Sequence, residues 1–211
     1  MAVSEFLIKW GITGFIWSAW CVLHSMLNSE GPIRKSDLLD SSIGPYYRLI
    51  YTVFAAITLL LACWITPKWE DFQLWRIEGP ALILQLLAWS LAVVMFYLTF
   101  KIFNIWYFLG LTALGIGPKT NNSQERLITW GIYGLIRHPQ FAAGLIILWM
   151  RDLTDTGLII NIVLSVYLIV GARIEETRLL AMYGNEYAEY MKKVPRFIPN
   201  RIPSIQAVLR G

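Results

Sequence analysis

Hydrophobic positions along the chain fall into long stretches that polar segments separate, and the three longest stretches predict helices. They run from about Phe6 to Leu27, from about Tyr47 to Thr66 and from Pro80 to about Phe103. A helix needs about 20 apolar residues to cross a bilayer core about 30 Å thick. The pattern therefore predicts three membrane spans. We expect the first to be retained, since no small-residue cleavage site of a signal peptide follows it.

Two shorter apolar runs, 141–150 and 157–171, predict a helical hairpin around the polar turn 151–156. Because the first of these runs is short for a span, we expect its helix to begin upstream of Pro139, near Ile132. The whole pattern then predicts about five transmembrane helices, with the two termini on opposite sides of the membrane.

The composition agrees with this pattern. Of the 211 residues, 56% are hydrophobic and only 15% are charged, and the mean hydropathy is +0.53. An average soluble domain carries about 25% charged residues, so the composition argues against both a soluble fold and a disordered chain. Cys21 and Cys63 lie inside apolar runs and predict neither a disulfide framework nor a zinc site. We expect an all-α polytopic membrane protein.

Lysine and arginine predict the orientation in the membrane. Four of the 18 would lie on the side of the N-terminus and fourteen on the side of the C-terminus. The four are Lys9, Lys68, Arg76 and Arg151. Positive residues favour the cytoplasmic side, so we expect the N-terminus outside and a cytoplasmic, helical C-terminal tail. The pI of 9.1 then reflects membrane orientation, and no arginine–aromatic pattern indicates a nucleic-acid partner.

Three polar clusters in the C-terminal part contain residue types that carry chemistry. Arg137-His138-Pro139 places hydrogen-bond donors at a helix start, where proline restricts the backbone. Glu175-Glu176 lies where the last span leaves the membrane, and carboxylates at such a boundary have a partner by default. Residues 182–199 carry tyrosines and lysines at a spacing typical of an interfacial helix. Taken singly, each cluster is also compatible with an anchor or a solvated helix face.

Together and in this order, the clusters resemble the signature of the isoprenylcysteine carboxyl methyltransferase family of integral-membrane enzymes. The matching motifs are Gly131-Ile132-Tyr133, Arg137-His138-Pro139, Glu175-Glu176, Tyr183-Gly184, Tyr187, Tyr190 and Val194-Pro195. The resemblance implies an S-adenosylmethionine-dependent methyltransferase with a lipophilic or small acceptor, either a carboxylate or a thiol. It also implies that residues 127–199 form the cofactor-binding catalytic half of one integral-membrane domain, 1–211.

The resemblance further implies roles for single residues, with no metal site among them. Those implied to bind the cofactor are Leu127, Ile128, Tyr133, Arg137, His138, Pro139, Gln140, Phe141, Glu175 and Tyr187. Arg173 and Glu176 are the implied catalytic residues. The chain departs from the family at Phe141, where a tyrosine is usual, and at Gly171, where an arginine often orients the acceptor. Arg173 is two residues from that position, a rotation of about 200° on a helix.

The N-terminal half supports a second hypothesis. Leu23-His24-Ser25 and Tyr46-Tyr47-Arg48 resemble the start of NnrU-like proteins and of the related methanethiol S-methyltransferases. That resemblance leaves open a haem-binding membrane isomerase or redox protein that uses His24 and His138. A non-enzymatic membrane scaffold is the third possibility.

Overall fold

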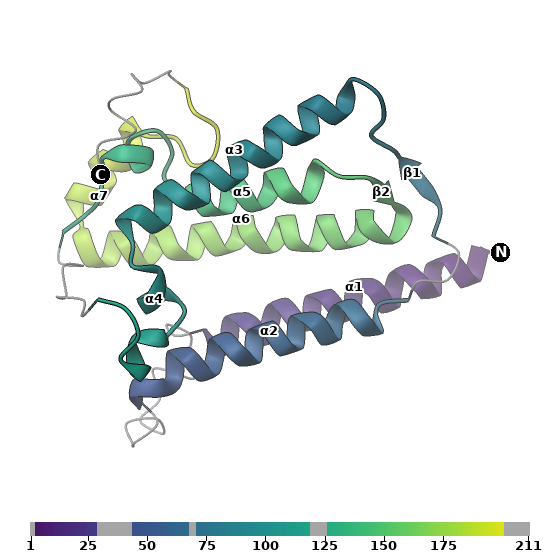
Figure 1. Cartoon of the computed structure of the whole chain (residues 1–211), viewed down its shortest axis with the longest axis horizontal. Coiled ribbons are helices and arrows are strands. Elements are labelled where there is room, and N and C mark those ends of the chain that lie inside the picture. Colours follow the sequence, from purple (N-terminus) through teal and green to yellow (C-terminus); the bar gives the residue numbers. More distant parts are fainter. Residues whose placement is uncertain (1–2, 29–43, 68–70, 119–125, 201–211) are drawn as a thin grey trace. The chain divides into compact units, whose positions relative to one another are not determined.

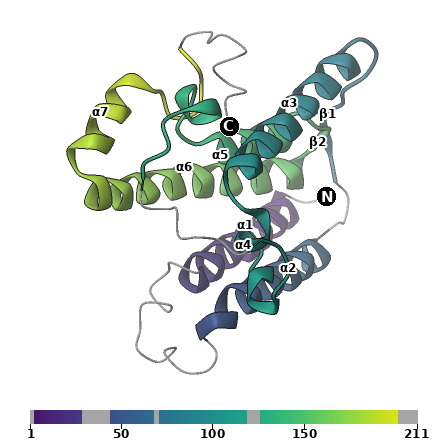
Figure 2. The same ribbon diagram turned by 60° about the vertical axis from the view of Figure 1, so that its left-hand side comes forward.

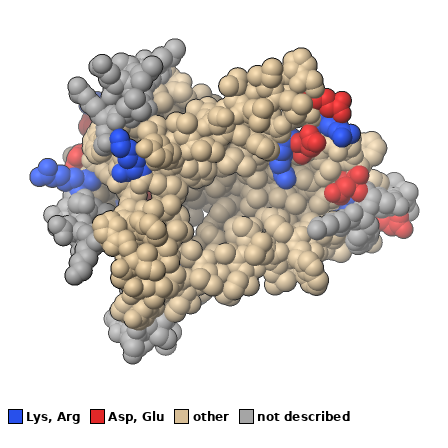
Figure 3. Space-filling model, viewed as in Figure 1, with Lys and Arg blue, Asp and Glu red and all other residues tan. Residues whose placement is uncertain are grey.

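A computed structural model describes residues 3–28, 44–67, 71–118 and 126–200. Among them, four helices are long and apolar enough to cross a membrane, which is the architecture of an all-α, multi-pass integral membrane protein. These helices are α1 (Val3–Leu27), α2 (Tyr47–Ile65), α3 (Ala81–Ile102) and α6 (Asp155–Tyr183). On the face shown in Figure 3, charged side chains lie at helix ends; within α3, for example, the only one is Lys101. The predicted fold class is confirmed.

The fifth predicted span is a short helix, α5 (Pro139–Trp149). Its predicted start near Ile132 is wrong, because residues Gly131–Gly134 form a 3₁₀ turn, η5, that Gly131 enters with φ +62°. Pro139 then sets the first helical position, since proline lacks an N–H and disfavours helical backbone at the residue before it. With 11 residues, α5 is about 16 Å long and is too short to span a membrane alone.

The chain divides into two compact units, and α6 contributes to both. Unit 1 comprises Met1–Leu74, Asn104–Thr120 and Thr154–Leu164, and unit 2 comprises Trp75–Phe103, Asn121–Leu153 and Ser165–Gly211. Two short strands, β1 (Gln73–Trp75) and β2 (Leu153–Thr154), pair in a small sheet.

In unit 1, α1 packs beside α2, as the two ribbon views show (Figures 1 and 2). The short elements of this unit are η2 (Gly44–Tyr46), α4 (Ile105–Phe108) and η3 (Leu111–Leu114). Gly110 has φ +78°, and a Cβ atom there would lie 2.4 Å from the backbone nitrogen of Leu49. Glycine is therefore required where this segment meets α2.

Unit 1 also buries an ion cluster around Lys9, whose side chain is 0% exposed. Its Nζ lies 2.7 Å from Asp155 Oδ2 and 3.3 Å from Asp71 Oδ1, and Trp10 Nε1 donates to Asp155 at 2.9 Å. The single charge within the first apolar stretch is thus paired inside the protein. Its partners come from the α2–α3 connection and from the start of α6.

In unit 2, α5 runs alongside α3 and the middle of α6, where Trp149 of α5 donates to Ser165 of α6 (Figures 1 and 2). Its core contains small and aliphatic side chains, namely Ala92, Met95, Leu98, Ile132, Ile136, Ala142 and Ala143. After Gly184, the helix α7 (Asn185–Lys193) buries Tyr187 and Tyr190 and leaves its charged residues exposed. The predicted hairpin of two apolar helices is present, and a helix follows it where an interfacial helix was predicted; these helices bring the three polar clusters together.

Candidate functional site

The turn Arg137-His138-Pro139 connects η5 to α5 and is fastened to the segment that follows α7. The backbone N–H of Arg137 donates to Pro195 O at 2.9 Å, and that of His138 donates to Arg196 O at 3.1 Å. The guanidinium of Arg137 also donates to the carbonyls of Met191, at 3.0 Å, and Val194. Hydrogen bonds therefore hold together the Arg137 turn and the Val194-Pro195 segment, two motifs that are far apart in sequence.

Glu176 lies at the centre of a buried network, with a side chain only 4% exposed. Its Oε1 accepts from Arg137 Nε at 2.9 Å and Nη2 at 2.7 Å, and from Arg196 Nε at 3.1 Å. Arg196 Nη2 donates to the other oxygen, and His138 Nε2 lies 3.2 Å from Oε1. Interaction with Glu176 also raises the pKa of Arg196 above its ordinary value. One carboxylate therefore joins α6, the Arg137 turn and the tail.

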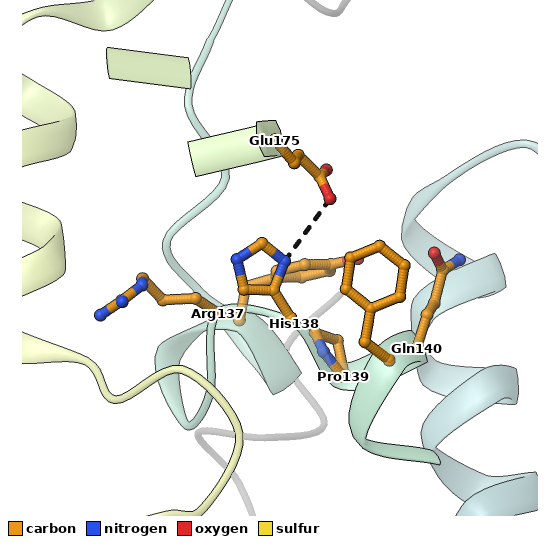
Figure 4. A pocket seen from close by; sticks show the side chains of 7 residues that line it. Arg137, His138, Pro139, Gln140 and Glu175 are labelled. Atoms are coloured by element: carbon orange, nitrogen blue, oxygen red, sulfur yellow. Dashed lines mark ion pairs between the residues drawn. The ribbon is translucent and has the colours of Figure 1, made fainter. Parts of the chain in front are cut away.

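A pocket opens beside this network, lined by Tyr133, Arg137, His138, Pro139, Gln140, Phe141 and Glu175. In Figure 4, His138 points toward Glu175, and the dashed line joins His138 Nδ1 to Glu175 Oε2, which are 3.5 Å apart. The Glu175 side chain is 39% exposed, whereas that of its neighbour Glu176 is 4% exposed. The imidazole stacks on Phe141, with ring centroids 5.5 Å apart. The pocket thus combines an accessible carboxylate, an imidazole and aromatic walls.

Three of the predicted cofactor residues lie outside this lining. Leu127 packs against a cluster formed by Tyr187, Tyr190 and Val194, and Ile128 is half-buried. The Tyr187 side chain is fully buried, its hydroxyl has no hydrogen-bond partner among the described residues, and burial raises its pKa to about 12. A buried hydroxyl without a partner is unfavourable, so a ligand or water that bonded to it would be stabilised there.

Arg173 and Gly171 lie two and four residues before Glu175 on α6. Arg173 is exposed and does not line the pocket, so the structure does not bring it to the other predicted site residues. A Cβ atom on Gly171 would lie 4.0 Å from Phe141 Cζ, so this position faces the aromatic wall. The acceptor role of Arg173 stays a prediction.

Two residues of the site were not among those predicted. Arg196 pairs with Glu176, and the Tyr190 hydroxyl donates to Tyr133 O at 2.6 Å, with the pKa of Tyr190 raised by burial. A signal for Arg196 is present in the sequence, since a basic residue directly after Val194-Pro195 is a natural partner for a boundary carboxylate.

The polar and aromatic parts of the methyl donor S-adenosylmethionine fit the chemistry of these residues. Its methionine part carries an ammonium group, which a partly exposed carboxylate and an imidazole nitrogen can bind. Its adenosine part is aromatic and polar, and the aromatic wall that Tyr133 and Phe141 form suits it. Among the residues that the structure describes, no three His, Cys, Asp or Glu side chains are grouped so as to hold a metal ion.

Comparison with known proteins agrees with the motifs. Methanethiol S-methyltransferase 1 of Bradyrhizobium diazoefficiens is 30% identical over 164 residues, 74% of this chain and 56% of that protein. Protein-S-isoprenylcysteine O-methyltransferase of Schizosaccharomyces pombe is 31% identical over 91 residues, 40% of this chain and 37% of that protein. The chain is related to these methyltransferases. The resemblance that the C-terminal motifs indicated is therefore confirmed.

The matches cover only part of these relatives, and another similar protein is named as an isomerase. The chain spans little more than half the length of the first of these relatives. The chloroplastic 15-cis-zeta-carotene isomerase of Zea mays is 29% identical over 191 residues, 85% of this chain and 47% of that protein. No family model and no solved structure matches the chain.

Proposed function

We propose that this protein is an integral-membrane methyltransferase that uses S-adenosylmethionine and methylates a lipophilic or small carboxylate or thiol. The observation that supports it most is the pocket at the Arg137 turn, where His138 and the accessible carboxylate of Glu175 lie together. The names of the relatives support the reaction class.

In this proposal, the chain's own residues bind the donor, orient it toward the acceptor and exclude water. Bound S-adenosylmethionine supplies an electrophilic methyl group. Glu175 and His138 hold the polar end of the donor, and Phe141 and Tyr133 keep water from the reacting atoms. A carboxylate or thiolate acceptor is already a nucleophile, so the site needs alignment more than a strong base. We infer that the acceptor arrives through the bilayer, since the long helices present apolar side chains outward.

A direct test uses the purified chain in detergent. Calorimetry measures S-adenosylmethionine binding, and a radiolabelled donor measures methyl transfer to a panel of prenylcysteines, thiols and lipids. Saturable donor binding with labelling of one acceptor class is the expected result. Absence of donor binding under folded conditions would contradict the proposal.

The isomerase relative favours one second candidate, a haem-dependent membrane protein. In the structure, His24 Nε2 lies 2.8 Å from the Tyr51 hydroxyl, and the nitrogens of His138 face Glu175 and Glu176. Haem ligation through Nε2 of His24 would require that nitrogen to give up its hydrogen bond to Tyr51. We therefore expect no Soret band after reconstitution with haemin, and a band that His24→Ala and His138→Ala both remove would favour the second candidate instead.

The proposed orientation has its own test. We expect a cytoplasm-active reporter fused after Gly211 to give signal, because fourteen of the 18 basic residues belong to the predicted cytoplasmic side. A reporter active only outside, fused at the same position, is the matched control. Signal from that reporter alone would reverse the orientation.

The acceptor role proposed for Arg173 is tested by kinetics. If its guanidinium holds an acceptor carboxylate, Arg173→Lys should lower kcat/KM for the acceptor by about tenfold or more, because an ammonium cannot reproduce the bidentate contact. Donor affinity should stay at the parent value. Near-parent turnover in the lysine variant would identify Arg173 as a membrane-surface anchor.

A further inference from the structure

The imidazole of His138 lies between two carboxylates that differ in their surroundings. Nε2 faces Glu176 Oε1 at 3.2 Å and Nδ1 faces Glu175 Oε2 at 3.5 Å, and the ring is 4% exposed. Glu176 is buried and held by Arg137 and Arg196, whereas Glu175 lines the open pocket. The two nitrogens therefore serve different sides of the site.

The orientation of the ring is held on several sides. Phe141 stacks on it at 5.5 Å with an interplanar angle of 14°, and Phe197 of the tail lies 6.1 Å away. Its backbone N–H donates to Arg196 O, and the following Pro139 restricts its backbone. Exchanging the two nitrogens would require a ring flip against these contacts, so each nitrogen keeps its side.

We propose that Glu176 is a positioning residue that sets the tautomer of His138. A carboxylate paired with two arginines can only accept a hydrogen bond, so the nitrogen facing it, Nε2, carries the proton. Glu175 is also a carboxylate, but its Oε2 is farther from the ring, 3.5 Å from Nδ1, and its side chain is 39% exposed and so shared with solvent. The shorter contact to buried Glu176 therefore places the single proton of the neutral ring on Nε2, and Nδ1 is an acceptor that faces the pocket. Glu176 thus acts through His138, without touching either reactant.

This tautomer defines what the pocket binds. Nδ1 and Glu175 Oε2 are two acceptors 3.5 Å apart, an arrangement that one protonated amine satisfies by donating to both. Resting on the proposed function, the amine is that of the methionine part of the donor. The network of Arg137, Arg196 and Glu176 then fixes which nitrogen carries the proton of the neutral ring.

Nitrogen-15 NMR of the histidine rings tests the tautomer directly. The chain has two histidines, so labelled protein gives two rings, and His24→Gln assigns them. We expect His138 to show a protonated Nε2 and an unprotonated Nδ1 in the full-length wild-type protein, a measurement that needs no site variant. A proton on Nδ1, in either the neutral or the doubly protonated ring, would overturn the proposal.

Variants distinguish the effect of the Glu176 carboxylate on the His138 tautomer from the effect of the arginine that pairs with it. Glu176→Gln introduces an amide that can also donate, so we expect the His138 signals to shift toward the other tautomer. Arg196→Gln keeps the carboxylate and should keep the wild-type tautomer, as should Glu189→Gln on the exposed face of α7. An unchanged ring in Glu176→Gln, or an equal change in Arg196→Gln, would contradict the role of Glu176.

Donor binding supplies the functional measurement. Glu176→Gln should weaken S-adenosylmethionine binding about tenfold, and should add almost nothing in a His138→Ala background, because its effect passes through the imidazole. The wild type should also bind a donor analogue without the amino group about tenfold more weakly. If the losses of donor affinity in Glu176→Gln and His138→Ala were additive in the double variant, Glu176 would not act through His138. Failure of the wild type to bind any donor would instead defeat the proposed function, and the NMR result would still decide the tautomer.

Discussion

Replacing Lys9 by methionine is expected to lower the free energy of unfolding by about 3–5 kcal/mol, the usual effect of leaving a buried charge without its partner. The Lys9 side chain is fully buried and lies 2.7 Å from Asp155, whose side chain is 4% exposed. Methionine keeps the length and apolar character of the side chain but leaves that carboxylate without its cation. Thermal unfolding in detergent, followed by circular dichroism, measures the change.

The control for Lys9 is a lysine whose ion pair is exposed. Lys192 lies 2.6 Å from Glu189 on the outer face of α7, and Lys192→Met should leave the unfolding temperature unchanged because exposed pairs contribute little. Combining Lys9→Met with Asp155→Asn should restore part of the lost stability, since the buried one of the two carboxylates is then neutral, while Asp71 is partly exposed to solvent. A Lys9→Met protein as stable as the parent would contradict the buried pair.

His138→Ala and Glu175→Gln are expected to weaken S-adenosylmethionine binding by about tenfold to a hundredfold each, the range for a lost hydrogen bond to a charged group. Both side chains line the pocket, and their facing atoms are 3.5 Å apart. If they bind one amine, the double variant should lose less than the sum of the two single losses. Calorimetric titration of the purified variants measures all three affinities.

Two matched variants accompany this experiment. Glu189→Gln removes an exposed carboxylate of the same size outside the pocket lining and should bind the donor like the parent. Arg126 is exposed, and Arg126→Gln should likewise leave donor affinity unchanged. Parent affinity in both His138→Ala and Glu175→Gln would place the donor elsewhere in the protein.

The sequence by itself determined the class of the protein and its long helices. α1, α2 and α3 follow the three longest apolar stretches, because about 20 apolar residues and their internal backbone hydrogen bonds are what a bilayer requires. The motifs around His138 and Glu175 also indicated the relationship to methyltransferases, since a site needs the same side chains wherever the fold is kept. The length expected of a span gave the wrong start for α5, because the positive φ of Gly131 and the ring of Pro139 delay the helix to residue 139.

Only the tertiary structure decided how neighbouring residues of similar chemistry differ in burial and in partners. Glu175 and Glu176 are adjacent and chemically alike, but they point about 100° apart on a helix, so one faces the pocket and the other the arginines. The partners of Lys9 and Glu176 come from distant segments, and Arg173 is exposed one helix turn before Glu176. Such differences depend on long-range packing, which sets burial and pairing and which no local pattern of residue types encodes.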